Sequence, residues 1–237
     1  MSEAQDDDAK IPAPGWDAID RWVGAHFGGQ IPHQFTSRTA YELETQNPLP
    51  AVTVWATSAP AGWLYVTYGL SELFDKTSSD PSVSGFGFEL SMRLPAAASV
   101  SSGERPPAWP LRLLQSIGRH VLSTGASFDS GHAIDLGASL VAPDSDGPQD
   151  CALTGLICLP DPLLGKINTA HGSLLFLRLF GVAPRELEIL DGLELGDLVA
   201  CIAELSPFAI TDPARASFTE DPECSKVLRR YALGITL

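Results

Sequence analysis

At 237 residues the chain is long enough to bury a large core, and its 44% hydrophobic and 19% charged residues are those of an ordinary globular protein. Its formal net charge is −14, from 29 acidic and 15 basic side chains. Nucleic acid is therefore a poor partner, because phosphate binding needs clustered lysines and arginines, and here they are few and scattered.

The first residues predict a disordered acidic tail over residues 1–12, followed by one domain over residues 13–237. The segment MSEAQDDDAK is acidic and lacks the apolar stretch of a signal peptide. The longest apolar run, residues 174–182, is short and contains Arg178, so we expect no membrane-spanning segment. The four cysteines include no CxxC pair, which favours a reduced, cytoplasmic protein.

The N-terminal half predicts a helix followed by strands. Apolar residues at helical spacing predict a helix over residues 16–27, which Gly28 and Gly29 end. Alternating residues predict strands over residues 52–57 and 63–70. The second of these is apolar on both sides, as expected of a central strand. Residues 76–84 are polar and predict a loop.

Residues 84–94 contain the most informative pattern of the chain. Apolar side chains occupy every second position, at Phe86, Phe88, Leu90, Met92 and Leu94. This period predicts a strand with one face buried and the other toward solvent or a partner. Gly85 and Gly87 leave the second face bare, so another backbone, a ligand or one of the protein's own helices can approach there.

The C-terminal half continues the alternation of strands and helices. After an exposed connection at residues 95–107, Pro110 predicts the first turn of a helix that ends near Gly125. Strands are predicted over residues 132–136, 151–159 and 174–180, and helices over residues 184–191 and 195–205. The fold class is therefore α/β (α+β): a single domain with a central mixed β-sheet flanked by helices.

Motifs of catalysis are missing from the sequence. It contains no GxSxG elbow, no P-loop and no dinucleotide fingerprint, and no two of its five histidines have the spacing of metal ligands on one helix face. We expect no enzyme activity, no cofactor and no metal. His120 is expected to be half-buried at the edge of the core. The enzymatic alternative is a hydrolase that uses Ser130 or His120, with His132 and nearby carboxylates.

Four ordered blocks of this sequence resemble the Suppressor of fused family. They are YGLSELF at residues 68–74, SGFGFEL at 84–90, PPAWP at 106–110 followed by a helix, and FLRLFGV at 176–182 with REL at 185–187. The sequence ITD at 210–212 also matches, so the resemblance covers roughly residues 16–212. It implies a mixed sheet with helices packed against it. It also implies a compact single-domain form found in bacteria, since animal members carry a second, C-terminal domain.

The resemblance further implies a binding role. In animal members this domain helps to clamp an extended peptide of a transcription factor, which adds as a strand between the two domains. The polar positions that hold the peptide correspond to His120, His132 and Pro160, which all depart from the animal pattern, whereas Asp161 matches the family. Recognition of that same peptide is not expected, but addition of some extended segment to a sheet edge is.

The sequence thus predicts a non-catalytic module that binds a protein or an extended peptide. Bacterial members that this chain resembles are regarded as immunity proteins against polymorphic toxins, and the acidic charge suits a basic toxin such as a nuclease. A cytoplasmic scaffold or regulator that binds an endogenous peptide is the alternative.

The acidic side chains concentrate toward the C-terminus. Residues 181–224 hold ten acids against two arginines, which indicates either a solvated surface or a docking face for a basic partner. Trp55 and Trp63 fit a core position, an interface or a dimer contact equally well. The candidate partner-binding residues are His120, His132, Asp161, Glu186, Glu188 and Glu194.

Overall fold

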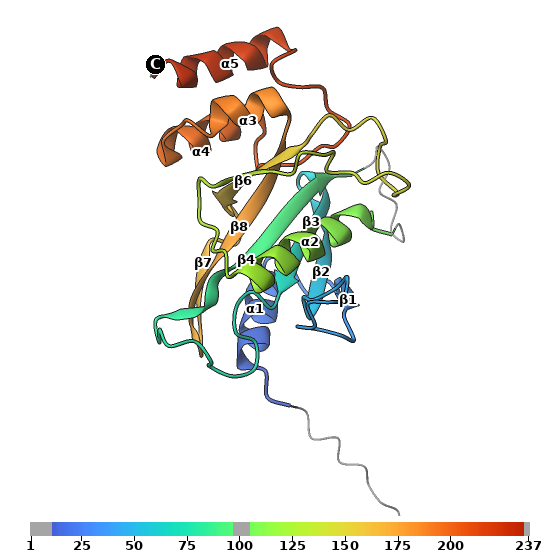
Figure 1. The fold of residues 1–237 in the computed structure, drawn as a ribbon, viewed down its shortest axis with the longest axis vertical. Helices are drawn as coiled ribbons and strands as arrows, with labels where there is room; N and C mark the ends of the chain where they lie inside the picture. Colours follow the sequence, from blue (N-terminus) through green and yellow to red (C-terminus); the bar gives the residue numbers. More distant parts are fainter. Residues whose placement is uncertain (1–10, 97–104, 235–237) are drawn as a thin grey trace, which may run out of the picture.

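The computed structural model describes residues 11–96 and 105–234 (Figure 1). Its helices are α1 (Pro14–Ala25), α2 (Trp109–Thr124), α3 (Pro184–Leu190), α4 (Leu195–Leu205) and α5 (Pro222–Ala232). Its strands are β1 (His33–Thr36), β2 (Ala51–Ser58), β3 (Ala61–Tyr68), β4 (Val83–Pro95), β5 (Ala133–Asp135), β6 (Gly155–Pro160), β7 (Lys166–Thr169) and β8 (Gly172–Val182). Most of the predicted acidic tail, and part of the predicted connection at 95–107, lie outside the described residues.

All eight strands belong to one sheet, with the order β1-β2-β3-β4-β8-β6-β5 and with β7 paired to β8. The β4–β8 pair is parallel and the other pairs are antiparallel. The predicted single α+β domain with a mixed sheet is therefore confirmed. The strand that was predicted over residues 174–180 lies in the interior of the sheet, between β4 and β6, as its continuous apolar sequence indicated.

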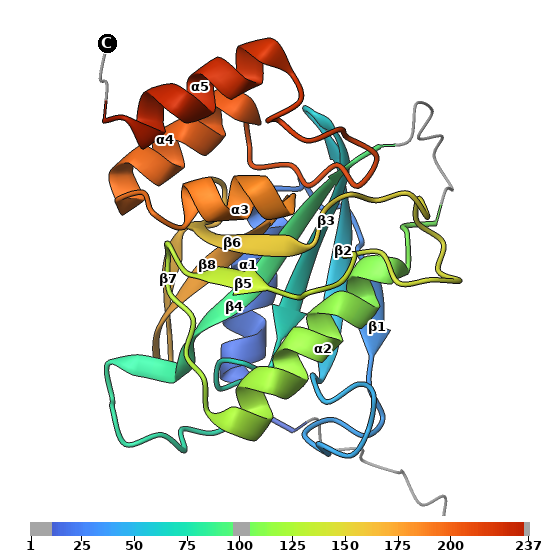
Figure 2. The ribbon, with the colours of Figure 1, turned by 45° about the horizontal axis from the view of Figure 1, so that its top comes forward.

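The helices cover the sheet in an uneven way. On one face α2 packs through Leu114, Ile117 and Val121 on the largest apolar cluster. On the other face α1 covers the part near β2 and β3 through Ile19 and Val23. The helices α3, α4 and α5 cover the part of that face near β6 and β8, at the opposite end of the molecule from α1 (Figures 1 and 2). This face is thus covered by two separate helical groups.

The prediction that one face of β4 is turned toward solvent or a partner is wrong over residues 88–94, because every residue there is buried. Phe88, Leu90, Met92 and Leu94 face α2. The alternate residues Glu89, Ser91 and Arg93 lie on the other face and are also buried. Polar residues can be buried there because they form hydrogen bonds and ion pairs, which the alternation of polar and apolar residues does not reveal.

Glu89 shows how such a residue is accommodated. Its Oε1 accepts hydrogen bonds from the backbone N–H groups of Gly69 (2.8 Å), Leu70 (3.1 Å) and Ser71 (2.9 Å), and Oε2 accepts one from the Thr67 hydroxyl (2.7 Å). The carboxylate therefore fixes the turn that follows β3. Burial outweighs these hydrogen bonds and raises the pKa of Glu89 to about 7.

The bare positions at Gly85 and Gly87 serve the protein's own chain. A Cβ added to Gly85 would lie 2.7 Å from the carbonyl oxygen of Leu70, so a neighbouring loop, and not a helix or a ligand, makes the close approach. Both glycines have positive φ angles (56° and 84°), and the β4–β8 register shifts between Val83 and Phe88. The glycines thus permit a bulge in β4.

Trp55 and Trp63 are both buried, so of their three predicted roles the structure selects the core. None of the helices in residues 11–96 and 105–234 is both long and apolar enough to cross a membrane.

Candidate functional site

The six candidate partner-binding residues divide into two groups. Asp161 and Glu186 are 2% and 0% exposed and form internal ion pairs. The prediction that these two acids contact a partner is therefore corrected, since neither carboxylate is accessible. The other four, His120, His132, Glu188 and Glu194, are exposed.

Glu186 connects α3 to the segment that leads to α5. Its carboxylate accepts hydrogen bonds from the N–H groups of Ala183 (2.8 Å) and Phe218 (2.5 Å) and from the Ser217 hydroxyl (2.9 Å). Arg215 completes the site, with its Nη2 2.5 Å from Oε2. Burial by itself would raise the pKa of Glu186, but the Arg215 guanidinium and the N–H donors outweigh it and lower that pKa.

Asp161 connects the end of β6 to the interior of the sheet. Its Oδ1 accepts hydrogen bonds from the N–H groups of Leu163 (2.8 Å) and Leu164 (2.9 Å), which closes a turn. Its Oδ2 accepts from the Ser91 hydroxyl and lies 2.7 Å from Nη2 of Arg178. Burial opposes ionisation, yet Arg178 and Ser91 hold the pKa of Asp161 below its usual value. Asp161 is thus part of the folded core.

The four exposed candidates lie around β5. His132 immediately precedes the strand, and Glu188 lines a groove beside it. Glu194 is adjacent to Leu195, whose Cδ1 would lie 3.7 Å from a Cβ added to Gly131. The structure therefore brings His132, Glu188 and Glu194, which are far apart in the sequence, to one end of the sheet.

His120 reaches the same region from α2. Its ring lies 6.4 Å from that of Phe128, centroid to centroid, with an angle of 23° between the ring planes. Phe128 belongs to the loop that leads into β5. His120 is exposed and lies beside this loop, and because Phe128 packs on the main apolar cluster, His120 lies at the edge of the core.

The strand β5 ends the sheet, and no other described strand pairs with its outer backbone edge. Cys158 donates its N–H to His132 O (2.9 Å), and Leu136 donates its N–H to Thr154 O (3.0 Å). Residues 132, 134 and 136 therefore direct their backbone groups toward β6. By the alternation of an antiparallel ladder, Ala133 and Asp135 direct theirs outward. Such an edge can accept another strand.

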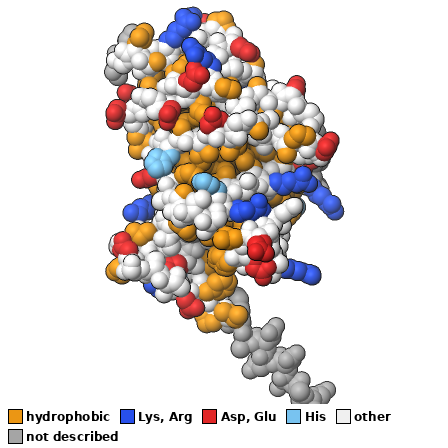
Figure 3. Space-filling model, in the orientation of Figure 1, with side chains coloured by type: hydrophobic (Ala, Val, Ile, Leu, Met, Phe, Trp, Pro, Cys, Tyr) orange, Lys and Arg blue, Asp and Glu red, His pale blue; other side chains and the backbone are white. Residues whose placement is uncertain are grey.

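The two sides of β5 differ in chemistry. On the α2 side, Phe128, Ile134 and Leu136 are only partly buried and pack on the main apolar cluster. On the α3 side, an open groove of about 360 Å³ is lined by Ala133, Asp135, Pro184, Leu187, Glu188 and Asp191. Figure 3 shows the first of these sides, where apolar side chains form a band between α2 and the α3–α5 group and histidines lie along it. We call this outward edge and its two flanks the β5 edge.

The β5 edge has the chemistry of a binding surface. The unpaired backbone groups of Ala133 and Asp135 can bond to an added strand, and the apolar flank can take every second side chain of that strand. The intervening side chains would face Asp135, Glu188 and Asp191, so basic residues suit those positions. Arg185 already pairs with Glu188 (2.6 Å), but both groups are solvated and such a pair contributes little.

Within the described residues, Ser130 and His132 do not form the hydrogen-bonded pair of a nucleophile and its base. The Nδ1 atom of His132 accepts the backbone N–H of Asp129 (3.2 Å), and within the described residues Ser130 Oγ makes no hydrogen bond to the His132 ring. Across residues 11–96 and 105–234, no group of three or more His, Cys, Asp or Glu side chains has the arrangement of a metal site.

Sequence reasoning missed Phe128, Asp135 and Asp191 as members of this surface. Asp135 lies in the predicted strand 132–136, and its spacing of two residues from Ala133 places both on one side of the strand. That signal was available. That Asp135 lines the same groove as residues of α3, by contrast, depends on the order of the strands in the sheet, and no local sequence pattern contains that order.

Comparison with known proteins identifies the relatives of this chain. The sequence model of the family described as Suppressor of fused protein (SUFU) matches residues 45–216. The Suppressor of fused homologs of Homo sapiens and Mus musculus are each 30% identical to this chain over 168 residues. Those matches cover 66% of this chain and 33% of each relative, so the match spans about a third of the length of these curated relatives.

Solved structures extend the similarity to the fold. A chain in the crystal structure of the Sufu–Fu complex aligns with a TM-score of 0.79 and 29% identity, over 92% of this chain and 98% of that one. Drosophila Suppressor of Fused aligns with a TM-score of 0.78 and 29% identity, over 92% of this chain and 54% of the other. A Suppressor of fused homolog from Neisseria gonorrhoeae, at 15% identity and a TM-score of 0.57, shares the fold over 86% of this chain and 96% of its own.

Proposed function

The chain belongs to the Suppressor of fused family, and from that premise we propose that it is a non-catalytic module that binds an extended segment of another protein along the β5 edge. The observation that carries this proposal is the outward backbone of Ala133 and Asp135, which lies between an apolar flank and an acidic groove. A family member crystallised as the Sufu–Fu complex supports a protein partner.

The chemistry of the two flanks specifies the segment. Successive side chains of an added strand point to opposite faces, so a segment that alternates apolar and basic residues fits both flanks. Its apolar side chains would cover Phe128, Ile134 and Leu136, and its lysines or arginines would face Asp135, Glu188 and Asp191.

The biological role that fits best is that of a cytoplasmic immunity protein against a basic toxin. The net charge of −14 would speed association with such a partner and favour it over acidic proteins. A scaffold or regulator that binds an endogenous protein would use the same edge. A toxin gene next to the gene of this protein favours immunity, whereas an isolated gene favours the scaffold.

The test blocks the edge without changing its charge. In Ala133→Pro, the outward N–H of residue 133 is removed, while the bonds of residues 132, 134 and 136 to β6 remain. Ala133→Ser is the matched control, since it keeps the N–H. Each tagged protein is used to capture partners from a lysate of the source organism, with elution by rising salt and quantitative mass spectrometry.

A basic protein that wild type and Ala133→Ser retain, and that Ala133→Pro loses, is the expected result. Rescue of growth by co-expression with that protein would establish the immunity role, and a non-toxic partner would establish the scaffold. Equal capture by all three proteins would exclude the β5 edge. Turnover of a substrate that the double variant His120→Ala, His132→Ala abolishes would instead establish the hydrolase.

A further inference from the structure

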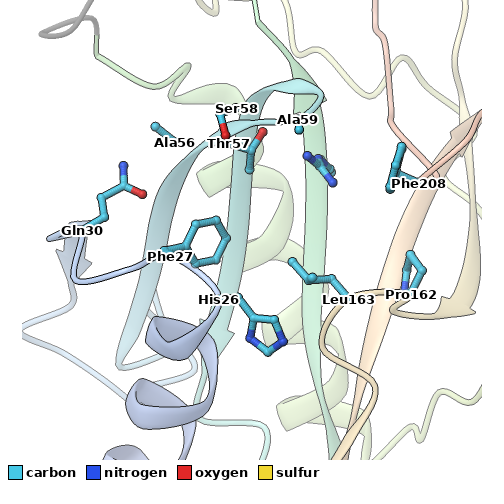
Figure 4. A pocket seen from close by; sticks show the side chains of 11 residues that line it. His26, Phe27, Gln30, Ala56, Thr57, Ser58, Ala59, Pro162, Leu163 and Phe208 are labelled. Atoms are coloured by element: carbon cyan, nitrogen blue, oxygen red, sulfur yellow. The ribbon is translucent and has the colours of Figure 1, made fainter.

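A pocket of about 630 Å³ opens on the sheet face opposite α2, between the two helical groups that share this face. Figure 4 shows that Phe27 and His26 reach it from the end of α1, Pro162 and Leu163 from the turn after β6, and Phe208 from the segment after α4. The β2–β3 turn closes the remaining side. We call this cavity the Arg93 pocket, because Arg93 of β4 is its charged residue.

Arg93 is buried, and in the part of the chain that the structure describes its guanidinium forms no ion pair or hydrogen bond with a carboxylate. The residue is 5% exposed, and its Nη2 donates to the carbonyl oxygen of Pro60 (3.0 Å). Its Nε has no hydrogen-bond partner among the described residues. A guanidinium carries five N–H donors, and a buried charge is costly unless it is paired.

The charges around Arg93 do not balance. Arg178 is fully buried next to it. Its Nη2 forms the ion pair with Asp161, and its Nε donates a further hydrogen bond (3.2 Å) to the same carboxylate. Asp161 therefore pairs with only one of the two guanidinium groups, which leaves one positive charge at the wall of the pocket. Burial and the nearby Arg178 lower the pKa of Arg93, and the charge of Asp161 offsets them only in part.

The segment that carries Phe208 is held in an unusual conformation beside this charge. Phe208 and Ala209 both have positive φ angles (71° and 49°), which non-glycine residues adopt rarely and at a cost. Arg178 Nη1 donates to Phe208 O (3.0 Å), and the Phe208 ring centroid lies 5.3 Å from Arg93 Cζ. Phe208 is nevertheless 51% exposed, so an apolar residue at the surface lies next to the Arg93 guanidinium.

The lining of the pocket contrasts with the rest of the chain. None of its eleven lining residues is acidic, although acids outnumber bases by 29 to 15 in the whole sequence. Phe27, Leu163 and Phe208 supply apolar walls. A cavity of several hundred Å³ with apolar walls and a single charged side chain is typical of a site that binds a small ligand of the opposite charge.

We propose that the Arg93 pocket binds a carboxylate together with an adjoining apolar group, presented by an aspartate or glutamate and a neighbouring apolar side chain of a partner protein. One carboxylate balances the single unpaired charge, and its planar pair of oxygens matches a guanidinium. A phosphate would bring a second negative charge for which the pocket holds no arginine. The site lies on the face away from the main apolar cluster that flanks β5, so it is separate from the β5 edge.

The test uses two pairs of probes that differ only in charge. The peptide Ac-Phe-Asp-NH2 is compared with Ac-Phe-Asn-NH2, and phenylacetate with phenylacetamide. Binding to the full chain is followed by NMR, through the backbone N–H groups of residues 56–59, 206 and 208–211 and through the Nε–H of Arg93. We expect saturable shifts with Ac-Phe-Asp-NH2 and about tenfold or greater weakening with the asparagine peptide, the size of a lost charge-assisted hydrogen bond.

Three variants assign the binding to the pocket. Arg93→Met should abolish the preference for the aspartate peptide, and Arg112→Met, at an exposed position of α2, should leave it unchanged. Phe208→Ala keeps the arginine and should weaken both peptides, which tests the site even if Arg93→Met does not fold. Binding of phenylacetate but not of the peptide would assign the pocket to a free carboxylate and overturn the protein partner. Equal binding of charged and neutral probes, or no binding, would overturn the site.

Discussion

Glu186 and Glu188 lie two residues apart in α3, yet they belong to different regions of the molecule. Residues two apart on a helix lie on nearly opposite sides of it, about 160° from each other. Glu186 therefore enters the core and meets Arg215, while Glu188 lies in the solvated groove of the β5 edge. The same division separates Asp161 and Glu89, which are buried, from Asp135 and Asp191. Burial, and not residue type, decides whether a carboxylate stabilises the fold or faces a partner.

The strongest test of this division compares the two glutamates directly. Glu186→Ala leaves Arg215, Ser217 and two backbone N–H groups without their acceptor, so it should lower the free energy of unfolding by about 3–5 kcal/mol. Glu188→Ala should change it by less than about 0.5 kcal/mol, because its pair with Arg185 is solvated. Urea denaturation measures both. Similar losses for the two variants would contradict the division.

A second test concerns the buried charges around Asp161. Asp161→Asn removes the carboxylate that pairs with Arg178 and whose charge also acts on Arg93, and should cost about 3 kcal/mol of unfolding free energy. Arg93→Met in the same chain removes one of the two cations, so it should restore about 1 kcal/mol of that loss. The double-mutant cycle is measured by urea denaturation. Strictly additive effects would show that Asp161 and Arg93 do not interact.

The third test uses pH to distinguish Glu89 from the other buried acids. Its pKa rises from 4.5 to about 7 in the folded state, so between these values the folded protein binds more protons than the unfolded chain. The free energy of unfolding should then fall by up to about 3 kcal/mol as the pH rises from about 4.5 to 7, and level off above. The carboxylates of Asp161 and Glu186 have lowered pKa values, so their stabilisation is instead lost in acid.

Glu89→Gln isolates the effect, because an amide keeps an oxygen acceptor for the turn at residues 69–71 but does not titrate. The difference in unfolding free energy between wild type and variant, measured from about pH 4 to 8, should therefore show the entire pH dependence that Glu89 contributes. A difference that does not vary with pH would show that the pKa of Glu89 is not raised.

The sequence motifs predicted the core better than the surface. Glu89 of the SGFGFEL block accepts hydrogen bonds from the turn after β3, and this turn is part of the YGLSELF block. Gly85 of the SGFGFEL block lets that turn approach closely. Glu72 of the second block in turn accepts the N–H of Gly85 (3.1 Å). The two blocks that carried the family resemblance thus bind each other inside the protein, so they identify the fold and give no information about a partner.

The elements that sequence analysis missed explain why the surface was harder to predict. The strands β1 and β7 are four residues long and mostly exposed, so no apolar period marks them. The helix α5 has an N-cap at Asp221 that was readable, but among its residues only Leu228 is buried. The Arg93 pocket depends on the gap between α1 and the α3–α5 group. Only the packing of distant segments creates that gap.

The smallest effect, and the most specific to the edge, is expected from its charges. Glu188→Lys or Asp191→Lys should slow association with the partner captured through β5 severalfold and flatten the dependence of the rate on salt, because solvated charges act mainly on encounter. Glu194→Lys should act more weakly, since Glu194 does not line the groove. Glu44→Lys, in the exposed loop between β1 and β2, is the control of equal charge. Stopped-flow association rates at about 50 and 500 mM salt measure this, and equal slowing by Glu44→Lys would mean that the partner responds to net charge alone.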